Sequence, residues 1–523
     1  MRVTTLARLL PVLLAGARPA LADGGGACAQ PREIDKYQLL KRLSLDLRGR
    51  IPSYEEYVAL DGGDDVPAAV IDEFVKSDDF RLQMRRYHDG MLWPNVGNVA
   101  LHGVETALTT IGPALLIASQ GRQQLYRAAQ NAGCDDYEHV DFDPAYPGEF
   151  RPLNKGGKRD GWRLVTPYWA PATKVKMCAF DAQETQSVVV NGVRVTCNSA
   201  AGLGRRECGC GPGGRFCYAP GGLADQAILG GLREQLSRAV DEVSVGGKPY
   251  TELLLGMRTA ENGPIAFWRK YLAPASSLGL TYNAPGKGEY VPDKEFTDAT
   301  WTEYSREGQH AGILTSSAYL LRFQTNRGRA NRFQNAFACD PFVPPAKAVG
   351  APGCSMTAPD LTNRCVCQYC HVKLEPIAAH FAMFAEAGTA NLADTAAYPR
   401  ENPYCVGRPT GLCQRFYVTQ TDAPRAGWLQ QYQFADVHPE YNDNIEKGPK
   451  KLAAQLIQSG SFANCTVKRL FHHLVKRDLR LFGDQADELA TLDELAKGFT
   501  ANGYSLPWLV KQIVKLPQYR RVR

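Results

Sequence analysis

Two cysteines and a histidine lie within five consecutive residues of this chain of 523 residues. Cys367 and Cys370 are followed directly by His371, which gives the pattern CxxCH, the attachment signature of a c-type haem. On the first turn of a helix, two such thiols can form thioethers with the two vinyl groups of one porphyrin. The adjacent imidazole then ligates the iron from the same side. The chain has 15 Cys and 9 His, so chance alone gives about 0.007 such matches. The sequence therefore predicts one covalent haem c, bound by Cys367, Cys370 and His371, with His371 as the metal ligand.

Three other chemistries are open to the same residues. Cys367 and Cys370 can form a disulfide beside an incidental His371, or they can act as a redox dithiol. Together with Cys365 and His371 they also make a set of four thiolate or imidazole donors for zinc. Under any of these alternatives, the protein would be a binding or structural protein of the cell envelope, or a thiol protein, without haem.

The spacing does not identify the sixth ligand of the iron. Candidates are two methionines and three histidines: Met356, Met383, His310, His380 and His438. Methionine as the second axial ligand raises the reduction potential, whereas an open sixth position permits ligand chemistry. The sequence thus leaves two haem functions open, one-electron transfer and catalysis at an open site, so whether the protein is an enzyme stays undecided.

The N-terminal residues 1–22 read as a signal peptide. Arg2 is followed by a short apolar stretch from Leu9 to Ala15, and Ala20-Leu21-Ala22 provides small residues for cleavage. A lipid anchor at Cys28 is an alternative. Fifteen cysteines also favour an oxidising compartment. We therefore expect a periplasmic, extracellular or envelope location.

Composition excludes some partners. The formal net charge is +6 and residues 1–22 contribute three arginines, so the mature chain would carry +3. A charge this small, without a dense basic stripe, argues against nucleic-acid binding. Beyond the N-terminus no segment reaches the length of a membrane span. We expect no integral membrane span, possible peripheral association with the envelope, and a redox partner protein.

Several other cysteines are placed for disulfides. Ser187–Thr196 is two β-branched runs around Asn191-Gly192, which predicts a hairpin with a type I′ turn. Cys178 and Cys197 bracket this hairpin and are expected to pair. Cys405 and Cys413 are expected to pair across a Gly/Pro-rich loop. A further group, Cys208, Cys210 and Cys217, predicts a loop tied by disulfides, with a zinc site as its alternative.

The spacing of apolar residues predicts a mainly α protein of several helical units. The units are a signal peptide (1–22), an N-terminal helical domain (33–95), a Cys/Gly-rich insertion with the β-hairpin (96–222), a second helical domain (223–340), the CxxCH segment (341–446) and a C-terminal helical domain (447–523). The last unit has four periodic segments with short connections, which is typical of a four-helix unit. The basic stretch from Arg322 to Arg332 reads as a solvated face, or as a face toward haem propionates.

Three parts of the chain resemble known families. LKRLSLDLRG at 40–49 with IPSYEE at 51–56 resembles the opening of planctomycete-type cytochrome-c-associated domains of unknown function. GILTS at 312–316, Asn326-Arg327 and CDPFVPP at 339–345 resemble a second such family, in which CxxCHxxxDPxGFxxENFDxxG follows. The tail at 452–519 resembles a third, C-terminal family.

The resemblance implies an exported, mostly helical, cytochrome-c-like protein, and it supplies no substrate. This chain keeps Pro376, Phe384 and Gly388 of the central pattern. It departs from that pattern at Glu375, where the family has Asp, and also at Ala378 and Met383.

Overall fold

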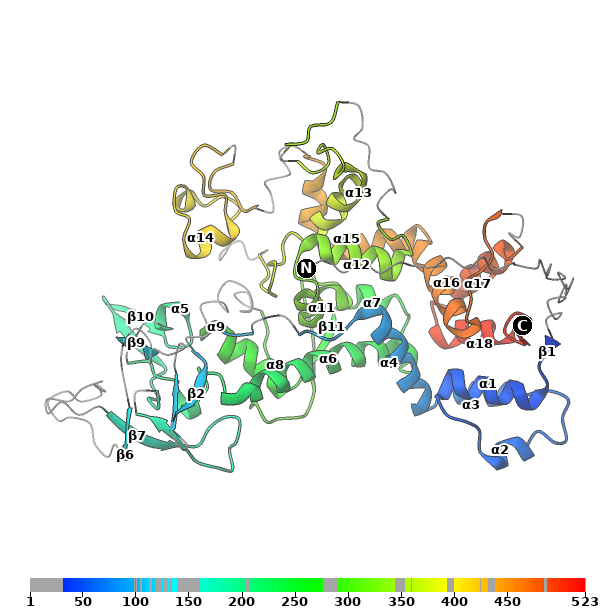
Figure 1. Cartoon of the computed structure of the whole chain (residues 1–523), viewed down its shortest axis with the longest axis horizontal. Helices are drawn as coiled ribbons and strands as arrows, with labels where there is room; N and C mark the ends of the chain where they lie inside the picture. Colours follow the sequence, from blue (N-terminus) through cyan, green and yellow to red (C-terminus); the bar gives the residue numbers. More distant parts are fainter. Residues whose placement is uncertain are drawn as a thin grey trace, which may run out of the picture.

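The computed structural model describes residues 32–522 with several gaps, so the predicted signal peptide and Cys28 lie outside the described residues. The described residues are 32–97, 99, 101–103, 106–111, 115–118, 125–126, 129–130, 134–138, 160–179, 181–203, 205, 207–275, 289–343, 353–358, 360–392, 399–423, 425–430, 438–483 and 487–522. Helices make up most of the regular structure, and most of the strands lie at one end of the molecule (Figure 1). The prediction of a mainly α protein is confirmed.

The N-terminal helices begin and end where the sequence provides caps. They are α1 (Lys36–Arg48), α2 (Tyr54–Val58), α3 (Ala68–Phe74) and α4 (Asp78–Leu92). The Asp35 side chain accepts a hydrogen bond from the backbone at the start of α1, and Gly49 ends that helix with a φ of 71°. Ser53 and Glu56 form the reciprocal capping box at the start of α2.

The insertion between these helices and the next helical unit contains more β structure than the sequence analysis predicted. A five-stranded sheet has the order β2 (Leu108–Ile111), β3 (Leu115–Ala118), β8 (Val175–Cys178), β7 (Asp160–Val165) and β6 (Cys134–Glu138). Expecting only one small hairpin was therefore wrong. Stretches such as VKMC and DGWRLV are short, and their alternation of apolar and polar residues extends over only about three residues, which is too few to predict a strand. A further small pair is β4 (Leu125–Tyr126) with β5 (Ala129–Gln130).

The predicted hairpin is confirmed. Strand β9 (Ser187–Val190) pairs antiparallel with β10 (Val193–Thr196), and Val190 lies opposite Val193. The turn residues Asn191 and Gly192 have φ values of 48° and 78°. Positive φ at both central positions is what a type I′ turn requires, and Asn-Gly is the dipeptide that adopts it most readily.

The second helical unit is built around the longest described helix, α6 (Leu223–Ser244). Its residues Ile228, Leu232, Leu236 and Val240, four apart, are all buried, as their spacing predicts. The shorter elements of this region are α5 (Ala200–Leu203), η2 (Pro212–Gly214), η3 (Pro220–Gly222), α7 (Glu252–Leu255), β11 (Arg258–Glu261), α8 (Gly263–Phe267), η4 (Trp268–Leu272), α9 (Ala273–Ala275), β12 (Thr302–Ser305), η5 (Gly312–Thr315), α11 (Ser317–Arg322), α12 (Asn326–Phe333) and η6 (Gln334–Ala338).

The CxxCH segment contains α13 (Gln368–Ala378), η7 (Ala379–Phe381), η8 (Pro403–Cys405) and α14 (Gly411–Phe416). The predicted four-helix unit follows as α15 (Tyr441–Gln458), α16 (Ser461–Val475), α17 (Leu489–Ala501) and α18 (Leu506–Lys515). Helix α15 begins before the predicted boundary at 447 and is kinked at Gly448, whose φ is 61° and which precedes Pro449. The four predicted C-terminal helices are therefore confirmed.

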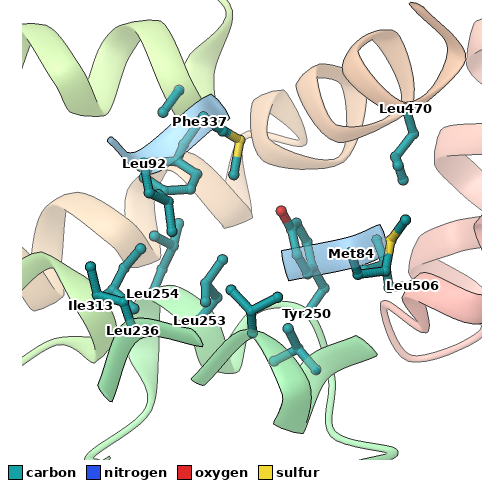
Figure 2. Close-up of a cluster of buried hydrophobic side chains, with 14 of the residues drawn as sticks. Met84, Leu92, Leu236, Tyr250, Leu253, Leu254, Ile313, Phe337, Leu470 and Leu506 are labelled. Carbon is teal, nitrogen blue, oxygen red and sulfur yellow. The ribbon is translucent and has the colours of Figure 1, made fainter. Parts of the chain in front are cut away.

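The three helical regions share one hydrophobic core. It extends from Leu39 in α1 to Tyr519 after α18. Figure 2 shows side chains from distant parts of the sequence meeting in it, among them Met84, Leu92, Leu236, Tyr250, Leu253, Leu254, Ile313, Phe337, Leu470 and Leu506. The ends of the described chain also pair, because β1 (Arg32–Glu33) lies antiparallel to β13 (Arg521–Val522). Among the described helices, none has both the length and the apolar character that crossing a bilayer demands.

Candidate functional site

The CxxCH residues occupy the first turn of α13, as predicted. The backbone N–H of Cys370 and that of His371 both donate to the carbonyl of Cys367, at 3.2 and 3.0 Å. Residues three and four apart lie on one helix face, so the two thiols and the imidazole share a face of α13. This helix is loosely packed, since only Ala378 in it is buried. All three candidate site residues are half-buried and accessible.

The two thiols of the motif are free, whereas ten other cysteines form disulfides. The disulfides are Cys197–Cys208, Cys210–Cys217, Cys339–Cys465, Cys354–Cys365 and Cys405–Cys413. Cys367 and Cys370 are therefore not bonded to each other. Because the CxxCH thiols alone stay reduced in a segment otherwise rich in disulfides, they are available for other chemistry.

The disulfides test several of the cysteine pairings that the sequence predicted. The pairing of Cys405 with Cys413 is confirmed, and so is a disulfide-tied loop at 208–217. The expected pairing of Cys178 with Cys197 is wrong, because Cys197 is bonded to Cys208. The sequence following the hairpin turns back through α5, which brings Cys208 to a Cα–Cα distance of 5.2 Å from Cys197.

The same disulfides remove cysteine ligands from both predicted zinc alternatives. Cys365 is bonded to Cys354, so it cannot serve as a thiolate donor beside Cys367 and Cys370. In the loop at 208–217 all three cysteines are bonded. Within the described part of the chain, no group of three or more His, Cys, Asp or Glu side chains is arranged to hold a metal ion.

The imidazole of His371 is held from one side by a carboxylate. Its Nδ1 lies 2.5 Å from Oε1 of Glu375, one helical turn further along α13. The same oxygen accepts a hydrogen bond of 2.6 Å from Nε of Arg327 on α12. An imidazole that donates from Nδ1 carries its lone pair on Nε2. The geometry therefore leaves Nε2 of His371 as the atom able to ligate a metal.

Exposed apolar side chains surround the motif. Val366, Tyr369 and Val372 are 45%, 45% and 59% exposed, respectively. Two further segments lie beside them and carry exposed apolar residues. The disulfide at Cys354 and the bridge between Ser355 and Arg364 hold Met356 close to the residues that precede the motif, and Val343 follows a segment whose Asp340 is paired with Lys373 of α13. Such clustering of exposed apolar residues is typical of a surface that another group covers.

Val366 has an unusual backbone. Its φ is 70°, in the left-handed region that a β-branched residue adopts only at a cost of about 1–3 kcal/mol. The reversal it makes separates Cys365, which is bonded to Cys354, from Cys367, which begins the turn of α13. The strained residue therefore lies directly between a structural cysteine and a motif cysteine.

Three candidates for the sixth ligand are buried away from solvent. Met383 belongs to a second, smaller hydrophobic cluster. Nδ1 of His380 is 2.9 Å from the carbonyl oxygen of Gly448, and burial lowers the pKa of His380 to about 4. Nδ1 of His310 lies 3.3 Å from Oγ1 of Thr315, and burial, with positive charge nearby, lowers the pKa of His310 to about 3.

The fourth candidate, His438, is engaged by carboxylates. Nε2 of His438 is 2.9 Å from Asp360 and Nδ1 is 3.1 Å from Glu440. Burial opposes protonation, but hydrogen bonds to these two carboxylates raise the pKa of His438. Asp360 also accepts from the backbone and hydroxyl of Thr362. Met356 remains as a solvent-facing candidate, with 71% of its surface exposed.

The basic stretch at 322–332 is not a solvated face throughout. Arg329 is fully buried and donates to backbone carbonyls, among them those of Phe384 and Ala385 in the segment after α13. Arg327 is bonded to Glu375. Sequence reasoning missed the roles of Arg327 and Glu375, although the four-residue spacing between His371 and Glu375 on a helix was a usable signal.

Comparison of the chain with models of known protein families, with curated proteins and with solved structures finds no match.

Proposed function

We propose that this chain is an exported, c-type cytochrome-like protein that binds one haem covalently and transfers single electrons. The observation that carries the proposal is the first turn of α13. Two free thiols and an imidazole with an available Nε2 share one helix face there, in a protein whose other described cysteines include five disulfides.

The residues fit a porphyrin in their chemistry. Cys367 and Cys370 would each add a thiol across one vinyl group, forming a carbon–sulfur bond while the thiol hydrogen goes to the vinyl carbon. His371 would hold the metal through Nε2, and its Nδ1 contact with Glu375 would fix the plane of the ring. Haem c, when bound, supplies a one-electron iron couple. The exposed residues Val366 and Tyr369 would shield the edge of an otherwise open ring.

Electron transfer is favoured by the place of the motif. α13 lies at the edge of the molecule and is covered by few other elements (Figure 1). A redox partner protein could approach such a site without a change of fold. The resemblance of the sequence around the motif to cytochrome-c-associated domains supports the same function, and the disulfides are compatible with export and an envelope location.

Expression with export in a host that attaches haem tests the proposal. We expect a Soret band, haem staining on a denaturing gel, and an intact mass that includes one haem and lacks residues 1–22. Replacing both Cys367 and Cys370 by Ser should abolish covalent haem. Replacing both Cys405 and Cys413 by Ser is the matched control, because it also removes two cysteines of this segment and should leave haem attached.

Two outcomes would contradict the proposal. One is a wild-type protein that stays free of haem in a competent host, which would favour a disulfide-bonded envelope scaffold. The other is a Cys367/Cys370 double variant that keeps covalent haem. Addition of cyanide or carbon monoxide to the haem protein separates the two haem functions, because a shifted Soret band would indicate an open sixth position and favour catalysis over electron transfer.

A further inference from the structure

A single carboxylate oxygen is shared by the predicted iron ligand and an arginine. Oε1 of Glu375 lies 2.5 Å from Nδ1 of His371 and 2.6 Å from Nε of Arg327. The side chains of His371 and Glu375 are 19% and 13% exposed, so water screens this contact only in part. The arginine is more open, at 41% exposed.

The three side chains are placed by rigid elements. His371 and Glu375 are four residues apart on α13, so they lie one above the other on its surface. Arg327 is in the first turn of α12, whose start is capped by the side chain of Thr325. That turn is also held to the segment after α13, because the backbone N–H of Asn326 donates to Glu386 at 2.8 Å.

A carboxylate at Nδ1 changes what the imidazole can do at Nε2. A hydrogen bond from Nδ1–H to a negative oxygen makes Nε2 more basic and fixes the tautomer. A more basic ligand stabilises ferric over ferrous iron and thus lowers the reduction potential. An arginine that donates to the same oxygen withdraws part of its negative charge and weakens this effect.

We propose that Glu375 is a positioning residue that strengthens the donation of His371 to iron and lowers the reduction potential, and that Arg327 limits this effect. The inference rests on the proposed haem function. The proposal assigns opposite effects on the reduction potential to two residues that contact the same oxygen atom. A purely structural role of these residues would not give shifts of opposite sign.

The experiment measures the reduction potential of the intact haem-loaded protein by spectroelectrochemistry. Glu375→Gln keeps the length and an oxygen acceptor but removes the charge. At a fixed potential we expect it to shift the ratio of reduced to oxidised iron upward by about tenfold, which for one electron is about 59 mV. Arg327→Gln should shift the ratio in the opposite direction. Glu375→Asp provides a second variant that retains the charge on a shorter side chain.

Asp340→Asn is the matched control, since it removes a carboxylate that pairs with Lys373 on the same helix and is not bonded to His371. We expect it to leave the ratio nearly unchanged. Attached haem with wild-type potentials in both Glu375→Gln and Arg327→Gln, or shifts of the same sign, overturns this inference and leaves the proposed function standing. A wild-type protein without covalent haem overturns both.

Discussion

Cys339, which ends the helical segment before the CxxCH region, is bonded to Cys465 in α16 across 126 residues of sequence. Cys339 adopts a left-handed conformation with a φ of 52° directly after η6, and Cys465 is buried in α16. The CxxCH segment, residues 341–446, thus lies between the two cysteines of this cross-link.

Removal of this disulfide should destabilise the protein strongly. Replacing both Cys339 and Cys465 by Ser should lower the free energy of unfolding by about 5 kcal/mol, because a long loop loses the most chain entropy when it is closed. Urea-induced unfolding under oxidising conditions measures the loss. The control is the pair Cys405 and Cys413, only eight residues apart, where the same replacement should cost about 2.5 kcal/mol. Equal losses for the two pairs would contradict the entropic explanation.

Because the backbone at Val366 is strained, replacing this residue by glycine should stabilise the protein. Val366→Gly should raise the free energy of unfolding by about 1 kcal/mol, because glycine adopts a positive φ without the clash of a β-branched side chain. Val372→Gly is the matched control, since Val372 is exposed within the regular turns of α13, and this variant should lose up to about 0.5 kcal/mol. Thermal unfolding of both variants in the haem-free protein makes the comparison. Destabilisation by Val366→Gly would show that the side chain contributes more than its backbone strain.

His88 should make the protein sensitive to acid. It is buried, with Nδ1 2.7 Å from the carbonyl oxygen of Met84 and Nε2 2.9 Å from the hydroxyl of Tyr250, and burial lowers its pKa to about 4. The neutral form is favoured in the folded state, so the contribution to stability is complete above pH 6.5 and is lost as the pH falls toward 4. The loss amounts to about 3 kcal/mol. In urea unfolding at a series of pH values, His88→Gln should show a correspondingly smaller fall. An unchanged pH dependence would mean that the pKa of His88 is the same in the folded and unfolded states.

His438 should give the opposite dependence of stability on pH. Its pKa is raised by hydrogen bonds to Asp360 and Glu440, against the effect of burial, so its protonated form is favoured in the folded state. Its contribution is complete below the ordinary histidine pKa and is lost as the pH rises through the raised value. His438→Gln should therefore destabilise the protein more at pH 5.5 than at pH 8.5. A larger effect at the higher pH would show that His438 is neutral between the two carboxylates.

The sequence predicted the elements whose information is local. The Asn191-Gly192 turn and the four C-terminal helices are each set by neighbouring residues, and the structure confirms them. The five-stranded sheet depends on contacts between distant short strands, such as the parallel pairing of β3 with β8. No local sequence pattern predicts such contacts.

The same difference between local and long-range information applies to the candidate site. The CxxCH motif could be recognised because the spacing of its three residues defines the pattern. The Cys405–Cys413 disulfide could be predicted because the two cysteines are close in sequence. The contact of Arg327 with Glu375 required the packing of α12 on α13, which periodicity does not supply. The pairing of Cys197 was misjudged for a related reason, since Cys178 and Cys208 both compete for it and the fold of the loop decides between them.

The pairing of β1 with β13 bears on the order in which the protein matures. Tyr519, whose hydroxyl donates to Asp46 at 2.9 Å, lies with Arg521 against the first described helix and strand, so the shared core cannot close until these late residues have been synthesised. Cys367 emerges well before them. Under the proposed function, the two thiols of the motif would therefore be accessible on the emerging chain before the shared core is complete.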